Sequence, residues 1–281
     1  MGKMPGHNNP DNRQLIVSTH SEDFLQGILD SSNENVTIVR VNRHDSINRM
    51  SILKNEEIVT LWTNPLLRYS NILSGLFHEI VIVCESDYDC LFYQAITNAI
   101  YENRGEIAPD VLFTHCGGKS RIKDAVSALK VVDVPVIAIC DFDLLNSGQN
   151  FRPLIEAFGA DWENVCSAGM KNVYDSMNAK NSSGNNAWGD IKAIGKAGFS
   201  RDAFASYEKV ESICKKAGLF IVPCGEMEDF DKSVGKDKKD WVYYVLENYD
   251  LAQEPKMNGA RSFIQEVLNY GLSYNSRFAH P

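Results

Sequence analysis

Residues 134–143 read Val-Pro-Val-Ile-Ala-Ile-Cys-Asp-Phe-Asp, an apolar run that ends in two aspartates. Three further short apolar runs cover residues 80–84, 111–116 and 219–224. Strands without polar alternation are buried on both faces, which is typical of a parallel sheet covered by helices. Between the runs at 80–84, 111–116 and 134–140, residues 88–102 and 121–130 have the periodicity of helices. We therefore expect an α/β fold with a parallel sheet flanked by helices.

The chain is expected to divide near residue 76. Residues 1–14 are polar and are predicted to be disordered, and residues 15–76 to form a small unit. Within that unit the pattern predicts, in order, a strand, a helix, two strands and a helix, over residues 15–19, 21–30, 36–42, 50–54 and 66–76. In residues 77–281 we expect the sheet, a helical insertion at about 151–218, and closing helices over 239–247 and 260–270.

Composition excludes several classes of protein. The 281 residues are 44% hydrophobic and 23% charged, which does not fit a disordered, collagen-like or disulfide-scaffold chain. The chain has seven cysteines, an odd number, and no two of them have Cys-x-x-Cys spacing. This pattern argues against a zinc site and against a disulfide framework. No apolar run approaches the roughly 18 residues of a membrane span, and the N-terminus lacks a signal-peptide core, so we expect a cytoplasmic protein without a membrane partner.

Carboxylates follow three of the predicted strands at the point where each strand ends. The six residues are Glu85, Asp89, Asp141, Asp143, Glu226 and Glu228. Because ligands bind at the carboxyl ends of strands in an open parallel sheet, we expect these side chains to converge. Crowded carboxylates repel one another unless a cation lies among them, and an oxygen-only set favours Mg²⁺ or Mn²⁺. The alternative for any single cluster is helix capping or a solvated turn.

Two of these clusters carry a family resemblance. Glu85-x-x-x-Asp89 and Asp141-Phe142-Asp143 resemble the glutamate motif and the Asp-x-Asp motif of a TOPRIM domain, the Rossmann-like domain of topoisomerases, primases and certain nucleases. More narrowly, the chain is similar to the C-terminal half of an OLD-family ATP-dependent nuclease, in its class 2 branch. Further matches are residues 16–21, the Gly-Gly-Lys loop after Cys116, residues 225–228, and the lysines Lys236 and Lys238.

The resemblance implies a metal-dependent DNA endonuclease that uses two Mg²⁺ or Mn²⁺ ions. It suggests that Glu85, Asp141 and Asp143 hold one ion, and that Asp89 holds the second with Glu226 or Glu228. Lys238, or alternatively Lys236, would lie near the scissile phosphate and offset its charge. Ser86 departs from the family pattern, which has glycine after the first glutamate.

A glycine-rich turn follows the second apolar strand. Gly117, Gly118, Lys119, Ser120 and Arg121 are candidates to bind phosphate, because a glycine turn before a helix presents backbone N–H groups; a plain β-to-α turn is the alternative.

For residues 15–76, the resemblance implies a remnant of an ABC-type ATPase domain, in which His20 would be the switch histidine. The alternative is that His20 is an ordinary turn histidine after a strand. The Walker A position that requires glycine holds Phe113, so ATP would act only in a full-length protein with an upstream ATPase domain.

Other functions share parts of this pattern. A haloacid-dehalogenase-type phosphatase also places Asp-x-Asp after a buried strand, but it wants Thr or Val where Leu145 stands. A topoisomerase or primase would need further domains, and a receiver-like module or a degenerate TOPRIM domain would be non-enzymatic. The net charge of −9 shows no overall basic field, so we expect the chain alone to bind DNA weakly and only with metal ions. The family suggests phage defence or DNA repair.

Overall fold

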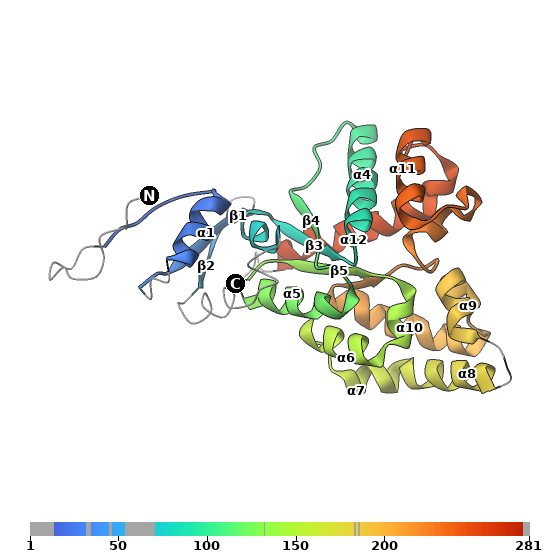
Figure 1. The fold of residues 1–281 in the computed structure, drawn as a ribbon. Coiled ribbons are helices and arrows are strands. Elements are labelled where there is room, and N and C mark those ends of the chain that lie inside the picture. The colour runs from blue at the N-terminus through green and yellow to red at the C-terminus, as the bar shows by residue number, and fades with distance from the viewer. Residues whose placement is uncertain are drawn as a thin grey trace.

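A four-stranded parallel sheet forms the centre of the molecule (Figure 1). The computed structural model describes residues 14–31, 35–44, 47–53, 71–131, 133–182, 184 and 186–277. The strands are β3 (Ile80–Cys84), β4 (Val111–His115), β5 (Val136–Cys140) and β6 (Leu219–Ile221). They lie in the order β4-β3-β5-β6, and every neighbouring pair is parallel. The prediction of an α/β fold with a parallel sheet is confirmed.

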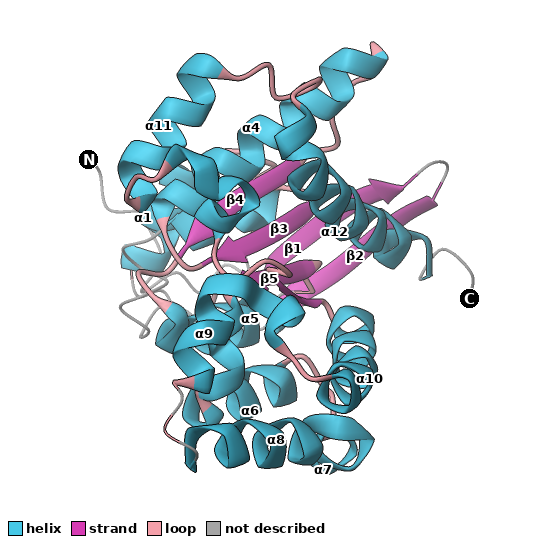
Figure 2. Ribbon diagram, turned by 90° about the vertical axis from the view of Figure 1, so that its right-hand side faces the viewer, coloured by secondary structure: helices cyan, strands magenta, loops and turns pink. Residues whose placement is uncertain are grey.

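The strands β3, β5 and β6 are buried on both faces, which explains the absence of polar alternation in them, whereas the edge strand β4 is only partly buried. Along β3, Val81 and Val83 belong to one core, whereas Ile80 and Ile82 belong to the other. The first core is covered by α5 (Lys119–Val131), α6 (Gly148–Ala157) and α10 (Arg201–Ala217). The second is covered by α4 (Asp87–Arg104), α11 (Lys238–Asn248) and α12 (Asn258–Arg277). Figure 2 shows these two groups on opposite sides of the strands.

The segment predicted as a helical insertion is helical. Between α6 and α10 lie α7 (Trp162–Val165), α8 (Lys171–Ser182) and α9 (Ala187–Ile194), joined by a π-helical turn at Cys166–Met170 and followed by a 3-10 turn at Gly195–Gly198. A 3-10 turn, η2 (Phe142–Asn146), leads into it from β5. The ring of Phe142 lies 5.6 Å from Phe199 and 5.2 Å from Tyr207, measured between centroids. This aromatic packing fixes the insertion to the end of β5.

The N-terminal part differs from its prediction in one place. Residues 15–19, expected as a strand, form no regular structure and have exposed side chains; an apolar run forms a strand only where another strand can pair with its backbone. The other expected elements are present as α1 (Glu22–Asp30) and the antiparallel pair β1 (Ile38–His44) and β2 (Ile47–Leu53). Of the helix predicted over 66–76, residues 66–70 lie outside the described ones, and the rest is the 3-10 helix η1 (Asn71–Phe77).

A buried arginine holds the β1–β2 hairpin to the sheet. Arg40 is 6% exposed, and its guanidinium donates hydrogen bonds to the carbonyls of Leu76, His78 and Asp133 over 2.7–2.9 Å. Two of these carbonyls come shortly before β3 and the third comes shortly before β5, so the hairpin packs on the amino-terminal edge of the sheet.

Two short helices complete the C-terminal part. They are η5 (Met227–Val234) and η6 (Pro255–Met257), and neither was predicted. Residues 1–13, nearly all of the predicted disordered segment, lie outside the described residues. None of the described helices has the length and apolar character to cross a membrane.

Candidate functional site

Glu85 and Asp141 meet where β3 and β5 end. The backbone N–H of Asp141 donates a hydrogen bond of 3.0 Å to Glu85 Oε1. Burial raises the pKa of Glu85, and the nearby charges of Asp143 and Asp89 add to the shift. Burial also raises the pKa of Asp141 well above its usual range, and the charge of Glu85 contributes next. These two carboxylates therefore lie in one crowded and poorly solvated place, as the parallel topology predicts.

Asp89 is shared between a helix cap and this cluster. Its Oδ2 accepts a hydrogen bond of 2.9 Å from the backbone N–H of Ser86, and its own backbone N–H donates to the Ser86 hydroxyl oxygen at 3.4 Å; these two bonds form the capping box of α4. The Ser86 hydroxyl also donates to Asp89 Oδ2 at 2.8 Å. Its Oδ1 lies 2.7 Å from Lys238 Nζ. Ser86 replaces the expected glycine without strain, because its φ of −138° is ordinary extended backbone.

Lys238 lies between carboxylates from two strands. Besides its contact with Asp89, its Nζ is 3.8 Å from Asp141 Oδ2. Burial alone would lower the pKa of Lys238, but the charges of Asp141 and Asp89 outweigh it and raise the pKa above its usual range. Of the two lysines predicted as alternatives, Lys238 is the one at the carboxylates; Lys236 lies 4.7 Å from the ring centre of Tyr244.

The glycine turn contacts the cluster rather than standing free of it. Gly117 and Gly118 have φ values of +74° and +121°, a region that favours glycine. The N–H of Gly118 donates to the carbonyl of Glu85 at 3.0 Å, so this amide, expected to be open to phosphate, is already bonded. Lys119 Nζ lies 2.6 Å from Asp143 Oδ2. Ser120 and Arg121, which follow on α5, are exposed.

Glu226 and Glu228 reach the same edge from β6. The carbonyl of Gly225 accepts a hydrogen bond of 2.8 Å from the N–H of Phe142, which joins this segment to the one after β5. Glu226 is the N-cap of η5, and its side chain lies near the charge of Asp141. Burial raises the pKa of Glu228, while Lys238 opposes the shift. All six predicted carboxylates therefore belong to one electrostatically connected set.

A lysine that the sequence analysis missed completes the set. Lys192, on α9 of the insertion, places its Nζ 2.9 Å from Glu226 Oε1. Its hydrogen bond with Glu226 raises the pKa of Lys192, and the charges of Asp143 and Asp141 add to it. Nothing in the sequence indicates this contact, because a lysine in an insertion has no fixed distance from the strand ends. His20, in contrast, lies in the exposed segment before α1, and none of the described contacts joins it to this edge.

The donor set fits Mg²⁺ or Mn²⁺ in its chemistry. Every candidate ligand is a carboxylate oxygen, and Asp143 Oδ1 and Glu228 Oε2 are buried without a hydrogen-bond partner. Within the described part of the chain, however, no three Asp, Glu, His or Cys side chains are grouped around one point as a formed metal site. Lys119, Lys192 and Lys238 each hold at least one carboxylate instead, since like charges stay together only when cations separate them. The two-ion site stays a prediction.

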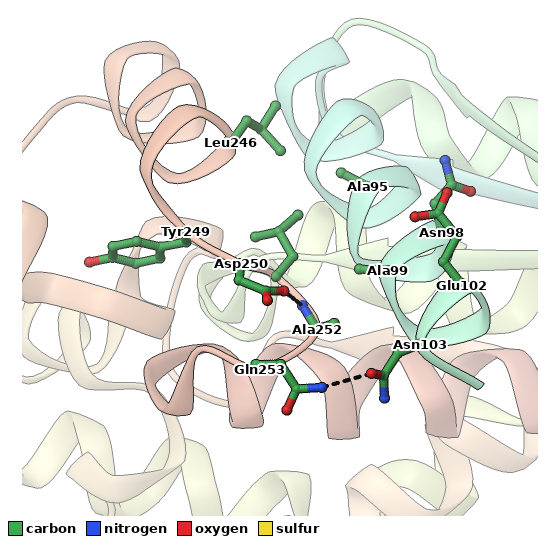
Figure 3. Close-up of a pocket in the computed structure, with 11 residues that line it drawn as sticks. Ala95, Asn98, Ala99, Glu102, Asn103, Leu246, Tyr249, Asp250, Ala252 and Gln253 are labelled. Carbon is green, nitrogen blue, oxygen red and sulfur yellow. Dashed lines mark hydrogen bonds between the residues drawn. The ribbon is translucent and has the colours of Figure 1, made fainter. Parts of the chain in front are cut away.

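A surface pocket of about 570 Å³ lies elsewhere (Figure 3). One side is formed by α4, through Ala95, Asn98, Ala99, Glu102 and Asn103, and the other by Leu246 of α11 and residues 249–253 that follow this helix. Within it, Gln253 Nε2 donates to Asn103 Oδ1 at 2.7 Å. Asp89 is at the first turn of α4, whereas this pocket begins about two turns later, so the pocket is separate from the acidic edge.

No model of a known protein family matches the chain, and no curated protein matches it at a significant level. The acidic edge is therefore the feature of the molecule from which a function can be inferred.

Proposed function

We propose that this chain is a TOPRIM-type nuclease that hydrolyses DNA phosphodiester bonds with two Mg²⁺ or Mn²⁺ ions, as part of an ATP-dependent OLD-type protein. One observation carries the proposal: carboxylates from the ends of β3, β5 and β6 converge around Lys238, a partly buried lysine whose pKa is raised by their charges. A purely structural role would not need six carboxylates at one sheet edge. In this proposal ATP acts only through the upstream ATPase domain.

The carboxylates would divide between the two ions as the resemblance suggests. Glu85, Asp141 and Asp143 would hold one ion, and Asp89 would hold the other with Glu226 or Glu228. Two such ions activate water and stabilise the leaving oxygen of a phosphodiester. The raised pKa values of Glu85, Asp141 and Glu228 support this arrangement. They mean that burial disfavours the charged form of each carboxylate, and a bound cation would stabilise that form.

Lys238 supplies a fixed positive charge at this edge. Its side chain is 26% exposed and its raised pKa keeps it as an ammonium ion at neutral pH. An ammonium held in a poorly solvated site stabilises the negative charge that develops on a phosphate during hydrolysis more strongly than it would in water. Arg121 and Ser120, which are exposed, would contact the DNA backbone, where contacts position the strand without reading its sequence.

The test is cleavage of supercoiled and linear DNA with Mg²⁺, Mn²⁺ or Ca²⁺. We expect nicking with Mg²⁺ or Mn²⁺, and about 100-fold or greater loss in Asp141→Asn and Glu85→Gln, because each removes a charged ligand. Glu208→Gln, on the exposed side of α10, is the matched control and is expected to cleave normally. Thermal melting checks that all variants are folded.

Two results would contradict the proposal. One is the absence of metal-dependent cleavage by the wild type at high protein concentration. The other is equal cleavage by wild type and Asp141→Asn, which would indicate a contaminating nuclease. Hydrolysis of an aryl phosphate in place of DNA would favour a phosphatase of the haloacid-dehalogenase type.

A further inference from the structure

The helical insertion contributes a cation to the acidic edge, through Lys192. We infer that Lys192 is a DNA-binding residue, whose ammonium contacts a backbone phosphate when a metal ion takes its place on Glu226. The inference rests on the proposed function and extends it to the insertion, which the sequence analysis left without a role.

Lys192 lies on the solvent side of the cluster. Its Nζ is 2.9 Å from Glu226 Oε1, and the Lys192 side chain is 48% exposed. The charges of Asp141 and Asp143 also act on it, so it lies within the field of the carboxylates that follow β5. A strand of DNA that approaches these carboxylates from solvent would meet this ammonium.

The backbone that carries Lys192 is fixed against the segment that carries Glu226. A Cβ atom at Gly225 would lie 2.3 Å from the carbonyl oxygen of Lys192, and one at Gly195 would lie 2.1 Å from the carbonyl oxygen of Pro223. The N–H of Lys196 donates to the same Pro223 carbonyl at 3.1 Å. Such close approach means that the insertion cannot shift without moving the Glu226 segment. The position of Lys192 is therefore set by the fold rather than by its ion pair.

Lys238 and Lys192 differ in what they can do after metal binding. Lys238 is largely buried and contacts both Asp89 and Asp141, so it keeps a partner if one carboxylate turns to a metal ion. Lys192 has one carboxylate partner among the described contacts, Glu226, and a metal ion bound to Glu226 would break that ion pair. A half-exposed ammonium on a fixed backbone then has phosphate as its natural partner, since charged hydrogen bonds to phosphate are strong.

The experiment compares Lys192→Met with Lys192→Arg in the full chain. DNA binding is measured by fluorescence anisotropy of a labelled duplex in Ca²⁺ over a salt series, and Mn²⁺ binding by calorimetry without DNA. We expect Lys192→Met to weaken DNA binding about five- to tenfold and to reduce the salt slope by about one. Its Mn²⁺ affinity is expected to be equal or higher, because a competitor for Glu226 is gone. Lys192→Arg is expected to bind DNA within about twofold of wild type.

Lys216→Met is the matched control. Lys216 is exposed near the end of α10, which leads into the start of β6, so it lies at the opposite edge of the sheet from Glu226. The same charge is lost there, and we expect no change in either measurement.

Three outcomes would overturn the inference. Unchanged DNA binding by Lys192→Met would show that the ammonium does not reach DNA. A parallel loss of Mn²⁺ and DNA binding would show that Lys192 only positions Glu226. If the wild type itself binds no DNA in Ca²⁺, the proposed function fails and this inference fails with it; that result is recognisable before any variant is compared.

Discussion

Substitution of Lys238 by methionine should destabilise the folded protein, and metal ions should reverse part of the effect. Lys238 Nζ is 2.7 Å from Asp89 Oδ1 and 3.8 Å from Asp141 Oδ2, and these two aspartates are 3% and 8% exposed. Methionine keeps the length and flexibility of the side chain and removes its charge. The variant therefore leaves two buried carboxylates facing each other without their cation.

The expected cost is about 3 kcal/mol. Removing one partner of a buried ion pair typically costs about 3–5 kcal/mol, and the lower end applies because the Lys238 side chain is 26% exposed. For a chain of this size, that corresponds to a fall in Tm of about 6–12 °C. The deficit should shrink as the pH is lowered from neutral. Burial and the charge of Glu85 already raise the pKa of Asp141, and its protonation removes one of the two unpaired charges.

The assay is thermal and urea unfolding of wild type and variant, with and without Mn²⁺. Mn²⁺ should stabilise Lys238→Met more than wild type, because an ion that binds only the folded state stabilises it by mass action and the variant lacks the competing ammonium. Lys236→Met is the matched control: it removes the same charge two residues away, where the ammonium lies over the ring of Tyr244, and should cost about 1 kcal/mol or less.

Two results would refute this reasoning. A loss of stability no larger than that of Lys236→Met would mean that the two aspartates do not need Lys238. A variant that is destabilised as expected, but gains nothing from Mn²⁺, would refute the metal site and leave the ion pair intact.

Two further predictions concern stability, each checked by urea unfolding. Gly195→Ala should lower the free energy of unfolding by about 3 kcal/mol or more, because the φ of +60° and ψ of −145° at this position suit glycine alone and the new Cβ would lie 2.1 Å from a backbone carbonyl oxygen. Gly235→Ala is the control: its Cβ would have no atom within 4 Å, and it should cost about 1 kcal/mol. Equal losses in the two variants would contradict the close approach at Gly195. Burial opposes ionisation of Asp231, but hydrogen bonds from Ser233 and Tyr249 outweigh it and hold its pKa at about 2. Asp231→Asn should therefore lower the free energy of unfolding by about 2 kcal/mol at pH 7. This loss should narrow as the pH falls from about 5 towards 2, because a lowered pKa stabilises the fold only where the group is ionised in the unfolded chain. A constant loss across that range would show that the Asp231 carboxylate does not have a lowered pKa.

The sheet could be predicted because its strands are buried on both faces. Runs such as 80–84 and 134–140 have no polar residue to mark an exposed face, and the structure shows β3 and β5 at the centre of the sheet. The same reasoning was wrong for residues 15–19, whose apolar pattern is similar. A pattern records the tendency of side chains to be buried, but a strand also needs a neighbour for its backbone groups, and the sequence does not say whether one is near.

The carboxylates could be predicted to converge because topology alone brings strand ends together. The lysines that hold them could be predicted only in part. Lys119 and Lys238 begin helices beside the sheet, so their place follows from the order of the elements. Lys192 comes from a helix whose path depends on the packing of the insertion, including the close approach of Gly195 to the segment before Glu226. Such packing depends on many small contacts at once and leaves no local signal.

The lysines also change what the acidic charge of the protein means. Six carboxylates and three lysines leave three negative charges at this edge, fewer than the four positive charges of two divalent ions. With both ions bound the edge would carry a net positive charge, although the chain as a whole carries −9. A phosphate would then be attracted locally by the same residues that repel it when the ions are absent. In the proposed nuclease, the lysines keep the metal-free edge from unfolding under its own repulsion, and the ions convert it into a binding site.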